Sequence, residues 1–133
     1  MAPPPLTRIL MVEDEADIQA VAKLALQAIG GFTIQICSSG SEALKIVPTF
    51  ASELILLDVM MPGMDGPSTL KALRGLPQTS ATPVIFMTAK VQPNEITQYK
   101  AMGALDVIAK PFDPMTLSAT INNIWRQYHD HCS

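Results

Sequence analysis

Short apolar runs, separated by longer amphipathic stretches, set the organisation of this chain. Three runs of four residues are wholly apolar, at positions 9–12, 54–57 and 84–87. Runs of this length, bounded by polar residues, are typical of strands buried on both faces. Two weaker runs, at 34–37 and 107–109, continue the series at intervals of roughly 20 to 30 residues. The pattern therefore predicts five strands.

Each predicted strand is followed by a segment in which apolar residues recur at helical spacing. The first helix ends at the glycine pair 30–31 and is expected to face the core through Ile18, Val21, Ala22, Ala25 and Ile29. The next three helices are expected at 41–50, 65–74 and 94–102. The last is expected to start at a cap formed by Asp113, with Pro114 in its first position, and to end near residue 128. A strand–helix order repeated five times predicts a parallel sheet with helices on both faces.

Composition narrows the class of protein. A chain of 133 residues with 48% hydrophobic and 16% charged residues fits one folded domain and excludes a disordered chain. The net charge of −3 disfavours a nucleic-acid binder, which needs a basic face. There is no apolar stretch long enough for a membrane span and no signal-peptide pattern, so we expect a cytoplasmic protein.

Polar residues at the ends of the predicted strands carry the candidate chemistry. These residues are Glu13 and Asp14 after the first strand, Asp58 after the third, Thr88 after the fourth and Lys110 after the fifth. Because the carboxyl ends of parallel strands meet at one edge of a sheet, we expect these side chains to converge there. Taken singly, each has an ordinary structural explanation as a helix cap, a turn residue or a solvated side chain. Their joint placement favours a shared site.

Electrostatics limit what such a site can hold. Carboxylates within about 5 Å of each other repel by roughly 3 kcal/mol per pair at an effective dielectric near 20. A divalent cation would offset that repulsion, and a set of oxygen donors without His or Cys favours Mg²⁺, with Mn²⁺ as a possible substitute. A lysine and a hydroxyl opposite the metal suit a phosphoryl group. Asp58 is then both a metal ligand and a candidate nucleophile.

Four motifs in the chain resemble the receiver domains of two-component response regulators. They lie at residues 9–15, 54–66, 83–89 and 109–112, and the stretch Asp-x-x-Met-Pro-x-Met-Asp-Gly in the second is the most specific. The resemblance implies an α/β, flavodoxin-like (βα)5 three-layer sandwich whose parallel five-stranded sheet has the order 2-1-3-4-5. It also implies a receiver domain at 7–128, between a disordered tail at 1–6 and a C-terminal tail at 129–133.

The resemblance implies a metal site and a phosphoryl site that share Asp58. Asp14 would bind Mg²⁺ directly, Glu13 would support the metal through water, and the main-chain carbonyl of Met60 would be the remaining protein ligand. Met60 also borders the phosphoryl site. Asp58 would accept the phosphoryl group.

Four further positions would serve the phosphoryl group or the switch. By resemblance, Thr88 bonds to the phosphoryl group and moves with it, the backbone of Ala89 reaches a phosphoryl oxygen, and Lys110 pairs with the phosphoryl oxygens. The bond from Lys110 to Pro111 is expected to be cis. Position 107 departs from the family pattern, because Val107 stands where an aromatic switch residue is common.

The implied function is signal transduction. The phosphoryl group would come from a histidine kinase or a His phosphotransfer protein. The output surface would be the face made by the fourth helix, the fifth strand and the fifth helix, including Tyr99 and Asp106. Such a domain catalyses only its own phosphotransfer and dephosphorylation, so it is not expected to be an enzyme in the usual sense. We expect no direct contact with nucleic acid or membrane.

Three other functions share parts of this pattern. A haloacid-dehalogenase-type phosphatase would need a second Asp two residues after the nucleophile, where this chain has Met60. A flavodoxin-type flavin carrier would need a phosphate loop where residues 13–15 are acidic. A phosphorylation-independent interaction module of the same fold would not need the complete set of polar strand-end residues. Within the receiver interpretation, the chain is a stand-alone regulator, a phosphorelay intermediate or a domain of a larger protein.

Overall fold

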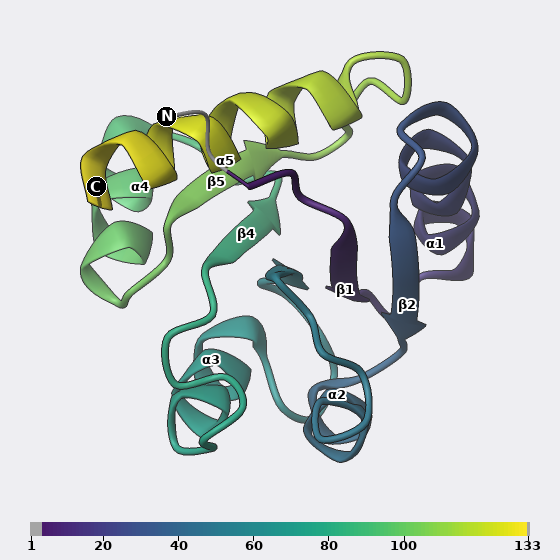
Figure 1. Cartoon of the computed structure of the whole chain (residues 1–133). Coiled ribbons are helices and arrows are strands. Elements are labelled where there is room, and N and C mark those ends of the chain that lie inside the picture. Colours follow the sequence, from purple (N-terminus) through teal and green to yellow (C-terminus); the bar gives the residue numbers. More distant parts are fainter. Residues whose placement is uncertain (1–3, 133) are drawn as a thin grey trace.

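A computed structural model describes residues 4–132, with side chains to residue 130, and shows one parallel sheet between two layers of helices (Figure 1). The strands are β1 (Arg8–Val12), β2 (Thr33–Cys37), β3 (Leu54–Asp58), β4 (Val84–Thr88) and β5 (Asp106–Ala109). Their order in the sheet is β2-β1-β3-β4-β5, and every neighbouring pair is parallel. The predicted flavodoxin-like fold is therefore confirmed. Within the described residues, no helix combines the length and apolarity needed to cross a bilayer.

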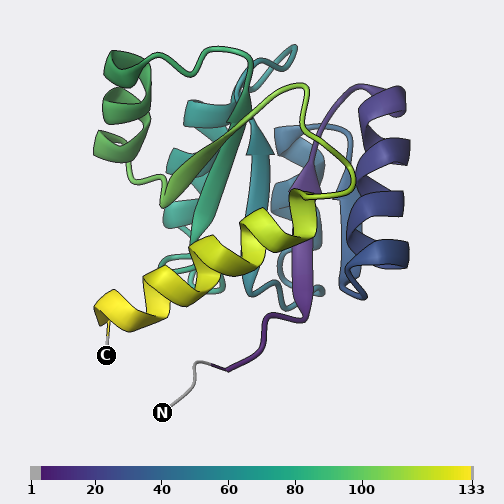
Figure 2. The ribbon, with the colours of Figure 1, turned by 90° about the horizontal axis from the view of Figure 1, so that it is seen from above.

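Alternating strand residues divide the core into two halves. In β1, Ile9 and Met11 pack toward α1 (Ala16–Lys23) and α5 (Leu117–Cys132), whereas Leu10 and Val12 pack toward the opposite layer. That layer contains α2 (Gly40–Ile46), α3 (Gly66–Arg74) and α4 (Pro93–Ala101). Figure 2 shows α1 and α5 lying on one side of the strands. Because both faces are covered, the central strands have no exposed side chain, as the apolar runs predicted.

The first helix departs from the prediction in its second half. After Lys23 the chain continues as a π-helix, η1 (Leu24–Ile29), which winds more residues into each turn than an α-helix. The wider turn brings Leu26 into the core with no exposed surface, while Val21 and Ile29 are left 40% and 46% exposed. The predicted stripe was wrong at both positions. It assumed α-helical spacing as far as Ile29, which lies in the π-helix, whereas Val21 lies before the π-helix, in α1.

The two ends of the chain also differ from the sequence pattern. Asp113 caps a turn, accepting a hydrogen bond from the Met115 N–H, and α5 begins only at Leu117. The helix continues to Cys132 and not to residue 128. In the segment predicted as an N-terminal tail, residues 1–3 lie outside the described part. Leu6 is buried, and the carbonyl of Pro4 accepts a hydrogen bond from the Trp125 indole at 2.8 Å. The domain limits at 7 and 128 remain predictions.

Candidate functional site

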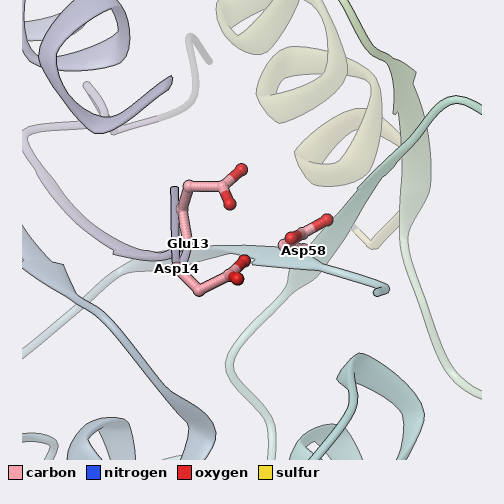
Figure 3. Close-up of side chains that lie close together, drawn as sticks. All are labelled: Glu13, Asp14 and Asp58. Atoms are coloured by element: carbon pink, nitrogen blue, oxygen red, sulfur yellow. The ribbon is translucent and has the colours of Figure 1, made fainter. Parts of the chain in front are cut away.

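The carboxyl edge of the sheet brings three acidic side chains together. Glu13 and Asp14 directly follow β1, and Asp58 is the last residue of β3. One carboxylate oxygen from each lies within 4.8 Å of the others (Figure 3). Glu13 and Asp58 are buried, and Asp14 is the most open of the three. The topology thus unites residues 44 positions apart, as expected from the parallel sheet.

Lys110 places a positive charge between two of these carboxylates. Its ammonium nitrogen lies 2.8 Å from Oε1 of Glu13 and 3.1 Å from Oδ1 of Asp58. The other carboxylate oxygen of Glu13 accepts a hydrogen bond from the Glu15 N–H at 3.1 Å. The peptide bond from Lys110 to Pro111 is cis, as predicted. The sequence placed Lys110 at this edge, but it did not reveal that the lysine bridges Glu13 and Asp58.

Burial and charge perturb both members of the Asp58–Lys110 pair. Burial raises the pKa of Asp58 to about 6, and the negative charge of Glu13 adds to the shift, while Lys110 opposes it. Burial also acts to lower the pKa of Lys110. The hydrogen bonds from its ammonium to Glu13 and Asp58 outweigh that effect, so the pKa of the lysine is raised. Asp58 is therefore a carboxylate in an environment that disfavours its charge.

The loop after β3 is fixed close to Asp58. Gly66, the first residue of α3, lies so near that a Cβ there would be 2.6 Å from the carbonyl oxygen of Asp58. Gly63 has a φ of 76°, a conformation that favours glycine. Between them and the strand, Met61 is buried, whereas the side chain of Met60 is 66% exposed. The backbone of Met60 thus stays beside the site while its side chain projects into solvent.

Thr88 ends β4 on the other side of the site. Its side chain is 3% exposed, and its hydroxyl oxygen accepts a hydrogen bond from the Lys90 N–H at 3.0 Å. Ala89 follows on the surface. Val107 lies opposite Phe86 in the β4–β5 pairing, half-buried against the core below α4. Tyr99, which we expected on the output surface, is instead buried in that core with 9% exposure.

A hollow next to Lys110 was not visible in the sequence. It has a volume of about 410 Å³ and lies between the first turns of α1 and the loop after β5. Its walls are mostly apolar and are formed by Asp17, Ile18, Val21, Ala89, Lys110, Pro111 and Phe112. Val21, which the sequence pattern placed in the core, instead lines this hollow and is 40% exposed.

A family model described as the response regulator receiver domain matches residues 9–122. This chain belongs to that family. The match covers the five strands apart from Arg8, together with their polar ends, so the four motifs seen in the sequence and the cluster seen in the structure belong to one receiver domain.

Individual relatives agree with the family match. The receiver domain is 37% identical over 124 residues to the transcriptional regulatory protein CpxR of Escherichia coli, covering 93% of this chain and 51% of CpxR. It is 40% identical over 122 residues to the transcriptional regulatory protein DltR of Streptococcus agalactiae, covering 90% of this chain and 52% of DltR. The chain thus spans about half the length of these curated relatives.

Among solved structures, the receiver domain is similar to the chemotaxis protein CheY4 of Vibrio cholerae. The TM-score is 0.82 at 31% sequence identity, and the match covers 90% of this chain and 99% of the chemotaxis protein. This neighbour has the same extent as the receiver domain, in contrast to the longer transcriptional regulators.

Proposed function

We propose that this receiver domain accepts a phosphoryl group on Asp58 from the phosphohistidine of a histidine kinase or a His phosphotransfer protein. The observation that carries the proposal is the position of Asp58, buried at the sheet edge within reach of Glu13, Asp14 and Lys110. In the transfer, a carboxylate oxygen of Asp58 forms a bond to phosphorus as the bond from phosphorus to the imidazole nitrogen breaks. The electron pair of that bond stays on the imidazole.

The acidic cluster fits Mg²⁺. Three carboxylates close together, two of them buried, carry more negative charge than the single Lys110 ammonium offsets, and oxygen donors are those that Mg²⁺ prefers. Asp14, Asp58 and the carbonyl of Met60 would hold the ion, with Glu13 supporting it through water. A bound Mg²⁺ would offset negative charge on the phosphoryl oxygens. Mn²⁺ offers similar chemistry and is expected to substitute.

Lys110 and Thr88 are placed to hold the phosphoryl group. The ammonium of Lys110 already contacts Asp58, so it needs only a small movement to pair with oxygens attached to that carboxylate. The Thr88 oxygen accepts the Lys90 N–H, which leaves the hydroxyl proton available to a phosphoryl oxygen. The small side chain of Ala89 leaves room for its backbone N–H to approach. These three residues would bind the group and keep it oriented.

The phosphodonor would dock beside this site. The apolar hollow next to Lys110 can take an apolar side chain of the donor protein, which would bring its phosphohistidine to Asp58. After transfer, movement of Thr88 would carry the change to the face of α4, β5 and α5, where a downstream protein binds, and Val107 would sit in the switch region without the swinging aromatic ring common in the family. The domain would catalyse only its own phosphotransfer and dephosphorylation.

The proposal also covers nucleic acid and membranes as possible partners. CpxR and DltR are named transcriptional regulators, and this chain matches about half of each. We propose that the receiver domain itself does not contact nucleic acid, because its net charge is −3. It is also proposed to act in the cytoplasm without binding membranes.

Phosphorylation by a small acyl-phosphate donor tests the assignment. With acetyl phosphate and Mg²⁺, the native domain should gain the mass of one phosphoryl group, and the product should be labile to hydroxylamine, as an acyl phosphate is. Asp58→Asn should gain none, whereas Asp113→Asn, at an exposed aspartate that caps a turn, should label normally. Absence of label on the native domain, or acyl-type label on Asp58→Asn, would overturn the proposal.

A further inference from the structure

Helix α4 is attached to the core through one side chain. Of its nine residues only Tyr99 is buried, whereas the nine residues of α3 include four that are buried. The first two residues of α4, Pro93 and Asn94, are exposed. Elements with few buried apolar contacts open at low free energy, so α4 should be more easily displaced than α3.

The single anchor of α4 lies on the strand that ends in Thr88. The Tyr99 ring packs edge-to-face on the ring of Phe86, with centroids 5.4 Å apart and planes at 79°. Phe86 precedes Thr88 by two residues in β4, and alternate residues of a strand point to the same face. Val107, paired with Phe86 across the strands, is small and leaves this face to the tyrosine ring.

We propose that the Tyr99–Phe86 contact is the latch that couples the state of the Thr88 side of the site to the position of α4. The proposal rests on the proposed phosphorylation of Asp58 for its trigger. When Thr88 is drawn toward the phosphoryl group, packing over Phe86 changes, and the ring resting on Phe86 transmits the change. Because no second buried side chain holds α4, the helix moves as a unit and presents a different surface to a partner. An aromatic residue at position 107 is then unnecessary.

The latch can be tested without phosphorylation by hydrogen exchange of the α4 amides. In the native domain, amides 96–101 should exchange faster than the amides of α3. Tyr99→Leu, which keeps apolar volume but removes the ring, should speed exchange in α4 by about 3- to 10-fold and leave α3 unchanged. Tyr99→Phe keeps the ring and should behave as the native domain. Tyr128→Leu alters the other tyrosine, on α5, and should leave α4 exchange unchanged.

Coupling to the site is tested by amide NMR shifts on adding beryllofluoride and Mg²⁺. In the native domain, shifts at 88–90 should be accompanied by shifts through α4. In Tyr99→Leu, the shifts at 88–90 should persist while those in α4 fall by at least about half. Equal α4 responses in the two proteins, or unchanged α4 exchange in Tyr99→Leu, would overturn the latch.

A second variant and a separate readout keep the outcomes distinct. If Tyr99→Leu does not fold, Phe86→Leu removes the other ring of the pair and should give the same loss of α4 protection. If the native domain shows no response to beryllofluoride at 88–90, the proposed phosphoryl site fails, while the hydrogen-exchange result still decides whether Tyr99 anchors α4.

Discussion

Helices α3 and α4 each have nine residues, each carries a proline in its first turn, and each follows a strand with five buried residues. They differ in how they are attached to the sheet. Helix α3 buries Gly66, Thr69, Leu70 and Leu73, and its first residue touches the backbone of Asp58. Helix α4 buries Tyr99 alone. Two neighbouring strand–helix units of the same length therefore differ in how firmly the helix is packed on the sheet.

This difference suits the two sides of the proposed site. The carboxylates must stay in place so that a metal and a phosphoryl group meet a fixed geometry, and β3 with α3 provides that rigidity. The side of the site formed by Thr88 can respond to a phosphoryl group, because α4, the helix that follows Thr88, buries only the ring of Tyr99. The same contrast organises the experiments below, from the largest expected effect to the smallest.

The side of the site formed by β3 and α3 should fail most completely when the proposed metal ligand Asp14 is removed. Asp14→Ala should lose Mg²⁺ binding and phosphorylation by acetyl phosphate together, because Asp14 is the most open carboxylate of the cluster. The fold should survive, since the change relieves repulsion among three acidic groups. Calorimetric Mg²⁺ titration and mass spectrometry check the two losses, and normal phosphorylation of this variant would remove Asp14 from the metal site.

Truncation in the two helices should separate their contributions to stability. Leu73 has no exposed surface, so Leu73→Ala in α3 should cost about 2–5 kcal/mol in the free energy of unfolding. Ile96 in α4 is half-buried, and Ile96→Ala should cost less than about 1 kcal/mol. Urea unfolding followed by circular dichroism gives both values. Similar costs at the two positions would contradict the comparison of the helices.

Asp58, the proposed acceptor, should weaken the metal-free fold at neutral pH. Its raised pKa means that the folded state binds the Asp58 proton more tightly than the unfolded state, so stability falls as the pH rises from about 4 to about 6. Asp58→Asn removes this penalty, and Lys110 keeps Glu13 as its partner. The variant should be more stable than the native domain by about 1–3 kcal/mol at pH 7.5 and equally stable at pH 4.

This prediction is checked by urea unfolding at the two pH values without Mg²⁺. A variant that is less stable than the native domain at pH 7.5 would show that pairing with Lys110 outweighs the cost of burying the charge.

The smallest expected effect concerns the lifetime of the phosphoryl group. The side chains at Met60 and Lys90 follow Asp58 and Thr88 by two residues, and neither is suited to orient an attacking water. Met60→Asn supplies an amide at the edge of the fixed side and should speed dephosphorylation a few-fold. Met102→Asn, at an exposed methionine at the end of α4, is the matched control and should have no effect. Equal rates in the native domain and Met60→Asn would contradict the argument.

Sequence reasoning predicted the parallel sheet and the convergence of the strand-end residues because both follow from backbone topology, whereas the strand order came from the resemblance to receiver domains. Buried parallel strands leave uninterrupted apolar runs, and a parallel sheet gathers its carboxyl ends at one edge. Thus Asp14 and Asp58 could be placed together although they are far apart in the chain, and the cluster confirms that placement.

Features that depend on side-chain reach or local winding could not be read in this way. Lys110 bridges Glu13 and Asp58 because of the lengths of those side chains, which no spacing rule expresses. The π-helix after Lys23 changes which residues face the core without a recognisable signal in the sequence. Tyr99 was expected on the output surface from the resemblance to the family, and only packing shows that its ring turns inward.

The hydrogen bond from the Trp125 indole to the Pro4 carbonyl places the tryptophan where its fluorescence reports on one end of the domain. Trp125 is the chain's single tryptophan, and it lies near the end of α5, packed edge-on against His129 and bonded to the segment before β1. This is the amino edge of the sheet, opposite the acidic cluster. Its fluorescence should therefore report detachment of α5 and the N-terminal segment, and a titration with Mg²⁺ should leave the emission nearly unchanged.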